Sequence, residues 1–241
     1  MTVLLLGGTG EARRLAEDLA GQFRVISSLA GRVREPRLPP GETRTGGFGG
    51  RAGFRTWLES NPVSAVIDAT HPFAATMTAT AAAVTAELGI PFLVLRRPGW
   101  QETPGDNWHW VGSVTEAAAS LPATRVFLTT GREELEAFAH LDTHWFLARS
   151  VEPPEPPMPR NLKVILDRGP FTADNELTLM RSHNVKVLVT KDSGGTMTSA
   201  KLTAARHVEI PVVIVRRPPL PEDVTSVPTV QAAISWLKNS V

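Results

Sequence analysis

The residues best suited to chemistry form a glycine turn near the start of the chain, Gly7-Gly8-Thr9-Gly10. A strand that ends in glycines and opens a helix exposes backbone N–H groups beside the positive end of the helix dipole, where phosphate binds. Gly8 and Gly10 fit two glycines of the G-x-G-x-x-G dinucleotide motif, whereas Arg13 occupies the third position. We predict a nucleotide site here; a tight turn without a ligand is the alternative.

The end of the second predicted strand indicates which nucleotide binds. An NAD site usually has an acidic residue there, bonded to the ribose 2′-hydroxyl. Here Ser27-Ser28 are followed by Arg32 and Arg34, and hydroxyls with cations suit a 2′-phosphate. Two charge-assisted hydrogen bonds of about 1.5–3 kcal/mol each would favour NADPH over NADH by about two to four decades. We therefore predict NADPH, with Arg32→Ala erasing most of the preference; arginines that merely solvate a loop are the alternative.

Three more features of the first half are candidates for cofactor contacts. Glu11 lies in the first helical turn and is expected to bond a ribose, since a phosphate placed too near would be repelled. In Gly46-Gly47-Phe48-Gly49-Gly50, the backbone at Gly47 can approach a flat ligand and Phe48 offers a stacking face; a flexible surface loop is the alternative. Asp68-Ala69-Thr70-His71 follows a buried strand, where open α/β sheets place ligands. His71 is a candidate proton donor or a structural residue.

The second half carries hydroxyl and cationic groups at the corresponding strand ends. These are Thr129-Thr130-Gly131-Arg132 and Thr190-Lys191-Asp192-Ser193-Gly194-Gly195, with Lys201 in the following helix. The set lacks an acidic ribose signature and suits carboxylates better than a second dinucleotide. Helix caps explain the Thr and Ser residues equally well, but not the three cations together.

Apolar runs predict the elements that position these residues. Strands are expected at residues 2–6, 23–27, 63–67 and 91–95, helices at 10–20 and 73–88, and a loop around at most a short strand at 36–53. Strands alternating with helices are typical of a parallel sheet with right-handed crossovers. The fold class is therefore α/β.

The second half repeats the first. Thr76-Met77-Thr78, Ile90-Pro91 and Arg96-Arg97-Pro98 recur 120 residues later, and the glycine turn has a counterpart at residues 129–132. The matches at 120 residues and the match at the glycine turn follow the same order on equivalent strands and helices. Together they predict two Rossmann-like lobes with parallel sheets and a ligand cleft between them. The boundary is placed in the loop 99–107, which gives a cofactor lobe at residues 1–106 and a substrate lobe at 107–241.

Composition excludes several function classes. A net charge of +1 with a pI near 8.2 argues against nucleic acid as a partner. Of the 25 basic residues five are Lys and 20 are Arg, which suits an acidic small molecule or reflects genome composition. The chain has no Cys, and its six His show no paired spacing, so no metal site is expected. No signal peptide or membrane span is predicted, and a cytoplasmic location is expected.

Several segments together resemble the precorrin-6A reductases of corrin-ring biosynthesis over nearly the whole chain. The resemblance implies hydride transfer from NADPH to a conjugated double bond of precorrin-6A, which gives precorrin-6B. It also implies that an acidic tetrapyrrole contacts the second lobe, with His71 or Lys191 assisting protonation. The matching segments are Leu6 to Ala12, Gly31-Arg32-Val33, Gly46 to Gly50, Asp68 to Ala74 and Thr190 to Gly195, of which the last two are the most family-specific.

Three alternatives to this activity remain at this point. They are a sensor that holds NADPH without turnover, the cobalt-containing form of the same substrate, and a short-chain type reductase. The last normally needs a Tyr-x-x-x-Lys pair, and the chain has no tyrosine. A monomer or a small homo-oligomer is expected.

Overall fold

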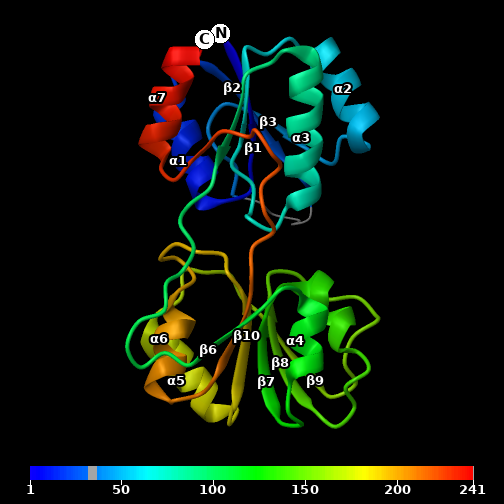
Figure 1. The fold of residues 1–241 in the computed structure, drawn as a ribbon, viewed down its shortest axis with the longest axis vertical. Helices are drawn as coiled ribbons and strands as arrows, with labels where there is room; N and C mark the ends of the chain where they lie inside the picture. The colour runs from blue at the N-terminus through cyan, green and yellow to red at the C-terminus, as the bar shows by residue number, and fades with distance from the viewer. Residues whose placement is uncertain (32–36, 241) are drawn as a thin grey trace. The chain divides into compact units, whose positions relative to one another are not determined.

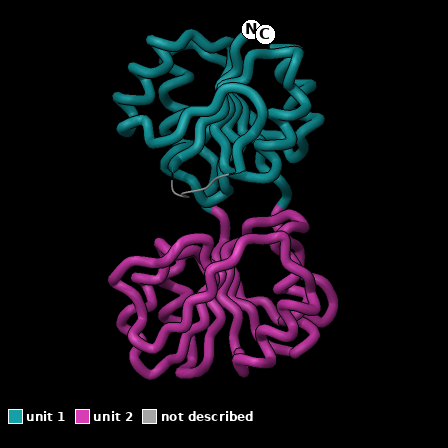
Figure 2. Tube along the Cα trace, turned by 180° about the vertical axis from the view of Figure 1, so that it is seen from behind, with its two compact units in different colours: residues 1–98, 218–241 teal, residues 99–217 magenta. Residues whose placement is uncertain are grey.

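The computed structural model describes residues 1–31 and 37–240 and divides the chain into two compact units. Unit 1 contains residues 1–98 together with the chain from residue 218 onward, and unit 2 contains residues 99–217 (Figure 2). The chain therefore passes between the units twice, after Pro98 and after Arg217.

Unit 1 is a six-stranded parallel sheet with helices on both faces (Figure 1). Its strand order is β12-β5-β4-β1-β2-β3, which is the Rossmann order with β12 in the sixth position. The strands are β1 (Thr2–Leu6), β2 (Arg24–Leu29), β3 (Glu42–Thr45), β4 (Ala65–Asp68), β5 (Phe92–Leu95) and β12 (Ser226–Val227). The helices are α1 (Gly10–Leu19), α2 (Gly50–Ser60), α3 (Ala75–Leu88) and α7 (Val230–Ser240).

Strand β1 is apolar from Val3 to Leu6 because helices cover it on both sides. Val3 and Leu5 pack with α1 and α7, whereas Leu4 and Leu6 pack with α2 and α3. Burial on both faces explains the continuous apolar run, since a strand with one solvated face would alternate. The carboxyl end of β1 therefore lies at a fixed position in the sheet.

Unit 2 repeats the arrangement. Its order is β6-β11-β10-β7-β8-β9, with β7 in the place of β1 and every neighbouring pair parallel. The strands are β6 (Trp108–Val111), β7 (Arg125–Thr129), β8 (Trp145–Ser150), β9 (Leu162–Leu166), β10 (Val187–Lys191) and β11 (Val212–Val215). The helices are α4 (Val114–Ser120), α5 (Ala173–Ser182), α6 (Ala200–His207) and the 3₁₀ helix η1 (Arg132–Phe138).

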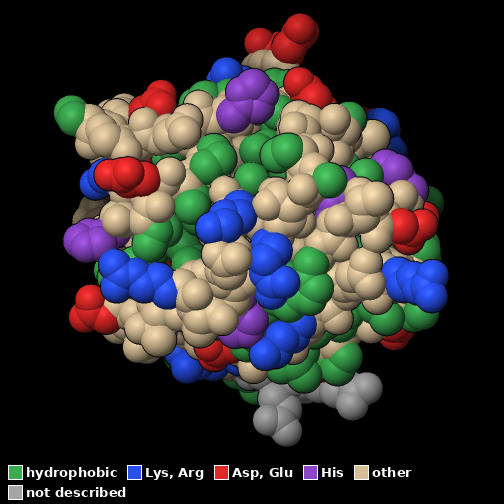
Figure 3. Space-filling model, turned by 90° about the horizontal axis from the view of Figure 1, so that it is seen from below, with side chains coloured by type: hydrophobic (Ala, Val, Ile, Leu, Met, Phe, Trp, Pro, Cys, Tyr) green, Lys and Arg blue, Asp and Glu red, His purple; other side chains and the backbone are tan. Residues whose placement is uncertain are grey.

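Figure 3 shows Lys and Arg side chains near the middle of the face seen from below, with Asp and Glu mostly towards its rim.

The sixth strands of the two sheets are exchanged along the chain. The segment after β5 supplies β6 to unit 2, and the segment after β11 supplies β12 to unit 1. Pairing with β12 covers the edge of β5, and α7 buries Ala233 and Leu237 in the core beside α1. The C-terminal segment thus belongs to unit 1, which differs from the expected lobes of residues 1–106 and 107–241.

The expected α/β class and the two Rossmann-like parallel sheets are confirmed. The repeat is visible in β5 and β11, whose bounds differ by 120 residues. The short strand allowed within the expected loop at residues 36–53 is β3, but the loop ends earlier than expected because α2 begins at Gly50. The ligand cleft expected between the lobes stays a prediction. None of the helices in the described part of the chain combines the length and the hydrophobicity that a membrane span requires.

Candidate functional site

The bend between β1 and α1 is fixed by the Thr9 side chain. Its hydroxyl donates to the Ala69 carbonyl at 2.7 Å and accepts from the Ala12 N–H at 3.1 Å, which caps α1. Ala69 directly follows β4, so this hydroxyl joins the carboxyl ends of β1 and β4. These neighbouring strands flank the switch point of the sheet, where Rossmann folds bind ligands.

The same bend presents backbone donors. Gly8 has a φ of 115°, a conformation that favours glycine. Within residues 1–31 and 37–240, the Gly8 and Thr9 N–H groups donate no hydrogen bond to a protein acceptor. The first turn of α1 also leaves N–H groups without partners inside the helix. This arrangement suits a phosphate, because the donors converge at the positive end of the α1 dipole.

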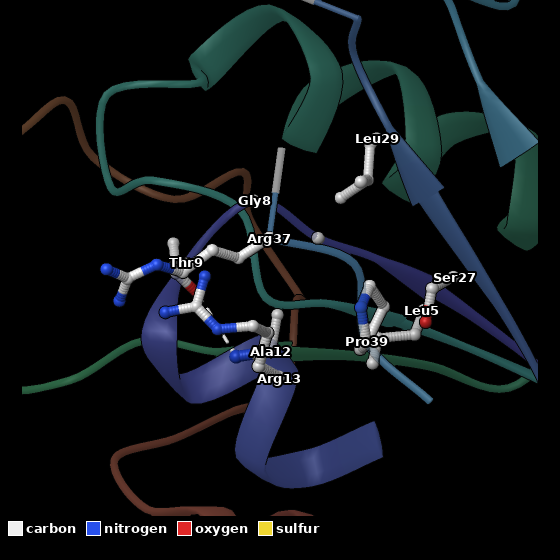
Figure 4. A pocket seen from close by; sticks show the side chains of 10 residues that line it. Leu5, Gly8, Thr9, Ala12, Arg13, Ser27, Leu29, Arg37 and Pro39 are labelled. Atoms are coloured by element: carbon white, nitrogen blue, oxygen red, sulfur yellow. Dashed lines mark hydrogen bonds between the residues drawn. The ribbon is translucent and has the colours of Figure 1, made fainter. Parts of the chain in front are cut away.

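A small pocket adjoins this bend (Figure 4). The Ser27 side chain in its lining is 1% exposed, and its Oγ has no hydrogen-bond partner in the described part of the chain. An unpartnered buried hydroxyl costs about 1–3 kcal/mol, which a ligand acceptor can recover. The pocket is lined by Leu5, Gly7, Gly8, Thr9, Ala12, Arg13, Ser27, Leu29, Arg37 and Pro39.

Two cations border the pocket. Figure 4 shows the side chains of Arg13 and Arg37 at the same end of it, beside Thr9. Sequence reasoning identified neither as a ligand contact, although Arg13 in place of the third motif glycine was a usable signal. The predicted Arg32 lies outside the described residues.

Ser28, predicted to contact the cofactor, lies on the other side of β2 from Ser27 because successive side chains of a strand alternate. Its Oγ accepts a hydrogen bond from Arg44 at 2.7 Å. Arg44 also donates to the carbonyls of Gly46 and Gly47, and partial burial lowers its pKa. Arg44 thus shapes the glycine loop, a role that its position just before the glycines could have suggested.

The predicted stacking residue Phe48 is largely engaged within unit 1. The Arg44 guanidinium lies 3.7 Å from the ring centroid, and the ring packs edge-on against Phe54 and Trp57. Phe48 therefore anchors the glycine loop to α2, and its stacking on a ligand stays a prediction.

Asp68 and Thr70 fix the loop after β4. Asp68 is 1% exposed; its Oδ1 accepts from the Thr70 N–H and hydroxyl, and its Oδ2 accepts from the Thr78 hydroxyl. These contacts make the carboxylate a structural acceptor for the loop that carries His71. The His71 ring is exposed, and its Nδ1 lies 3.3 Å from the Phe73 N–H.

Glu11 is paired within unit 1. Its carboxylate oxygens contact Arg14 at 3.2 Å and Arg97 at 2.9 Å, and the Glu11 and Arg97 side chains are mostly buried. The pairing offsets the negative charge beside the α1 N-terminus. Contact of Glu11 with a ribose stays a prediction.

Apart from His71 and Lys201, the residues predicted to bind the substrate lie at or just after the carboxyl ends of β7 and β10, which are neighbouring strands of unit 2. Thr130 is 5% exposed, and its Oγ1 has no partner in the described part of the chain. Thr129 donates weakly to the Val189 carbonyl, and Arg132 donates to Pro153. Thr130 is therefore the donor in this group that most clearly lacks an acceptor.

Strand β10 ends in a loop with cationic, hydroxyl and backbone groups. Lys191 forms an ion pair with Glu134, and the Ser193 Oγ lies 3.3 Å from that of Thr198. Gly194 and Gly195 have φ values of 63° and 70°. Successive N–H groups in such turns make concavities that bind anions.

Lys201, which the sequence predicts as a cationic substrate contact, is buried. It is 4% exposed, and its Nζ lies 4.9 Å from the centroid of the Trp100 ring. Burial and the charge of Arg149 lower the pKa of Lys201 to about 7, against the opposing effect of Glu176. Arg149 and Glu176 are themselves a buried ion pair.

Lys201→Met should change how stability depends on pH. The ordinary lysine pKa is 10.5, so between pH 7 and 10.5 the unfolded chain holds a proton at Lys201 that the folded protein lacks. Wild-type stability should therefore rise with pH by at most about 1.4 kcal/mol per unit. The variant, measured by urea unfolding from pH 7 to 10, should exceed the wild type most at pH 7. A constant difference over this range would contradict the assignment.

Comparison with known proteins identifies the family. A family model described as Precorrin-6x reductase CbiJ/CobK matches residues 2–238. A protein from Rhodococcus erythropolis named Precorrin-6A reductase is 51% identical over 239 residues, which are 98% of this chain and 96% of that protein. A solved structure named CobK precorrin-6A reductase superimposes with a TM-score of 0.94 at 41% identity, and the match covers 100% of this chain and 97% of that one. A Cobalt-precorrin-6A reductase from Priestia megaterium is 28% identical, with 90% of each chain covered. The chain belongs to the precorrin-6x reductase family.

Proposed function

We propose that this protein is an NADPH-dependent precorrin-6A reductase of cobalamin biosynthesis, which reduces a conjugated double bond of precorrin-6A to give precorrin-6B. The observation that carries the proposal is the full-length match to proteins of that name, at 41–51% identity. The protein would act in the cytoplasm, as expected from the sequence.

The β1–α1 bend and its pocket support a dinucleotide as cofactor. The N–H groups of Gly8 to Glu11 would hold the diphosphate, and the unpartnered Ser27 hydroxyl would bond the adenosine ribose or its phosphate. Arg13 and Arg37 supply positive charge at the same pocket, which favours NADPH over NADH.

The reduction needs a hydride and a proton. When bound, NADPH supplies the hydride from its nicotinamide ring. The protein contributes by holding the reacting atoms in place, and such positioning can lower a barrier by about 7–11 kcal/mol. His71 and Lys191 are our candidates for proton donation, because His71 lies in the loop after β4 and Lys191 ends β10, and both strands are central in their sheets.

The strand ends of unit 2 support an acidic tetrapyrrole as substrate. Thr130 offers a buried hydroxyl without a partner, and the 191–195 loop offers Lys191, Ser193 and two glycines in the left-handed conformation. Carboxylates of the macrocycle are suitable acceptors for these donors. The proposed substrate contacts are His71, Thr129, Thr130, Arg132, Lys191, Ser193, Gly194, Gly195 and the buried Lys201.

The direct test is an anaerobic assay of NADPH oxidation, with precorrin-6A and cobalt-precorrin-6A offered separately. We expect turnover with precorrin-6A and formation of precorrin-6B. Cobalt-precorrin-6A is included because a relative named Cobalt-precorrin-6A reductase matches 90% of this chain, although at only 28% identity. Binding of NADPH without turnover of either substrate would refute the proposal and favour the sensor.

The cofactor pocket predicts that Arg37→Ala lowers affinity for NADPH but not for NADH. Losing one charge-assisted hydrogen bond of about 1.5–3 kcal/mol should weaken NADPH binding about 10- to 100-fold. Dissociation constants for both nucleotides, measured by fluorescence titration, give the ratio directly. Arg32→Ala, measured alongside, shows whether Arg32 or Arg37 contributes more.

Arg24→Ala is the matched control for this pair. Arg24 is an exposed arginine at the amino end of β2, where it pairs with Glu42. Its loss should leave the ratio of the two affinities unchanged. An unchanged ratio in Arg37→Ala as well would remove this residue from the proposed 2′-phosphate site.

A further inference from the structure

We propose that Asp192 is a positioning residue for the tetrapyrrole, because it holds the 191–195 loop in the conformation that binds substrate. This inference rests on the proposed function and adds a residue that sequence reasoning left out of the site. Asp192 is the one acid in a loop whose other members carry the donors expected to bind carboxylates.

Asp192 is bonded to two separate segments of unit 2, the one at Trp100 and the one that ends β11 and continues to Arg217. Its N–H donates to the Val215 carbonyl at the end of β11, at 3.0 Å. Its Oδ1 accepts from the Trp100 N–H, also at 3.0 Å. Arg217 Nε lies 2.7 Å from the Asp192 carbonyl oxygen and 3.0 Å from Oδ2. Since Asp192 is 7% exposed, these bonds are largely shielded from water.

The segment at Gly99 and Trp100 fits closely around this carboxylate. A Cβ at Gly99 would lie 2.6 Å from Asp192 Oδ2, so a side chain there would displace the acid. The Trp100 indole Nε1 also donates to the Gly195 carbonyl at 2.9 Å. Trp100 therefore contacts the loop at both ends, at Asp192 and at Gly195.

The loop needs such anchoring because of its own composition. Gly194 and Gly195 add conformational freedom, which makes a fixed loop entropically costly. The ion pair with Arg217 also neutralises Asp192, so that a negative charge between Lys191 and Ser193 does not oppose an acidic ligand. Both effects act on binding of the tetrapyrrole and leave the cofactor pocket of unit 1 untouched.

Asp106 offers a matched control. It is a buried acid of the same unit that pairs with Arg206 at 2.8 and 3.1 Å and accepts from Thr103, but it contacts no residue of the 191–195 loop in the described structure. Loss of its charge should destabilise unit 2 to a similar degree without changing the loop.

The experiment compares Asp192→Asn and Asp106→Asn in the full-length protein. Dissociation constants for precorrin-6A and NADPH are measured separately, followed by KM and kcat. We expect Asp192→Asn to raise the precorrin-6A dissociation constant and KM about tenfold, with a smaller change in kcat and none in NADPH binding. Asp106→Asn should leave both dissociation constants at the wild-type value.

Gly99→Ala disturbs the same contact from the opposite side, and it should weaken binding of precorrin-6A without changing binding of NADPH. This second variant keeps the inference testable if Asp192→Asn does not fold. Unchanged precorrin-6A binding in the folded variants, or an equal loss in Asp106→Asn, would overturn the inference and leave the proposed function standing. Wild-type protein that binds NADPH but not precorrin-6A would overturn the proposed substrate and this inference with it.

Discussion

The two hydrogen bonds of the Thr9 hydroxyl set the geometry on which the candidate cofactor site depends. One bond caps α1 and the other joins the end of β1 to the loop after β4. Together they fix where the N–H groups of the glycine turn point, and the helix dipole then makes that position favourable for an anion. The Asp68 carboxylate further fixes the loop after β4, because it accepts hydrogen bonds from the hydroxyls of Thr70 and Thr78.

A repeated unit with exchanged sixth strands explains how one chain of 241 residues builds two sheets of the same order. Unit 1 receives its sixth strand, β12, from the part of the chain that follows unit 2. Unit 2 receives its sixth strand, β6, from the part of the chain that precedes its other five strands. Where the glycine turn of unit 1 bears backbone donors, the corresponding bend of unit 2 bears Thr129, Thr130 and Arg132. Divergence at these equivalent positions would let the two copies take a dinucleotide and an acidic ring respectively.

Much of the fold could be predicted from the sequence because local patterns carry it. The apolar run of β1, the glycines after it and the 120-residue repeat suffice for two Rossmann-like sheets. The exchange of β6 and β12 could not be predicted, since it depends on pairing between segments far apart in the chain. Helix α2 was missed because glycines stand at its N-cap (Gly49), its first residue (Gly50) and Gly53, and glycine disfavours helices.

The candidate site was predictable to a smaller extent. The turn at residues 7–10 is a local signal, whereas Ser27 and Ser28 look alike until the sheet shows which of them lines the pocket. The sequence marks Lys201 as a cation, but its burial and lowered pKa depend on the packing around it, including Trp100 and Arg149. Asp192 owes its contacts to residues 92 and 25 positions away.

Hydrogen exchange of the backbone amides at residues 7–12, with and without saturating NADPH, tests the central claim most directly. If these N–H groups hold the diphosphate, the cofactor should slow their exchange strongly, and exchange in β7 of unit 2 should stay the same. Unchanged exchange at residues 7–12 in protein saturated with NADPH would contradict the account.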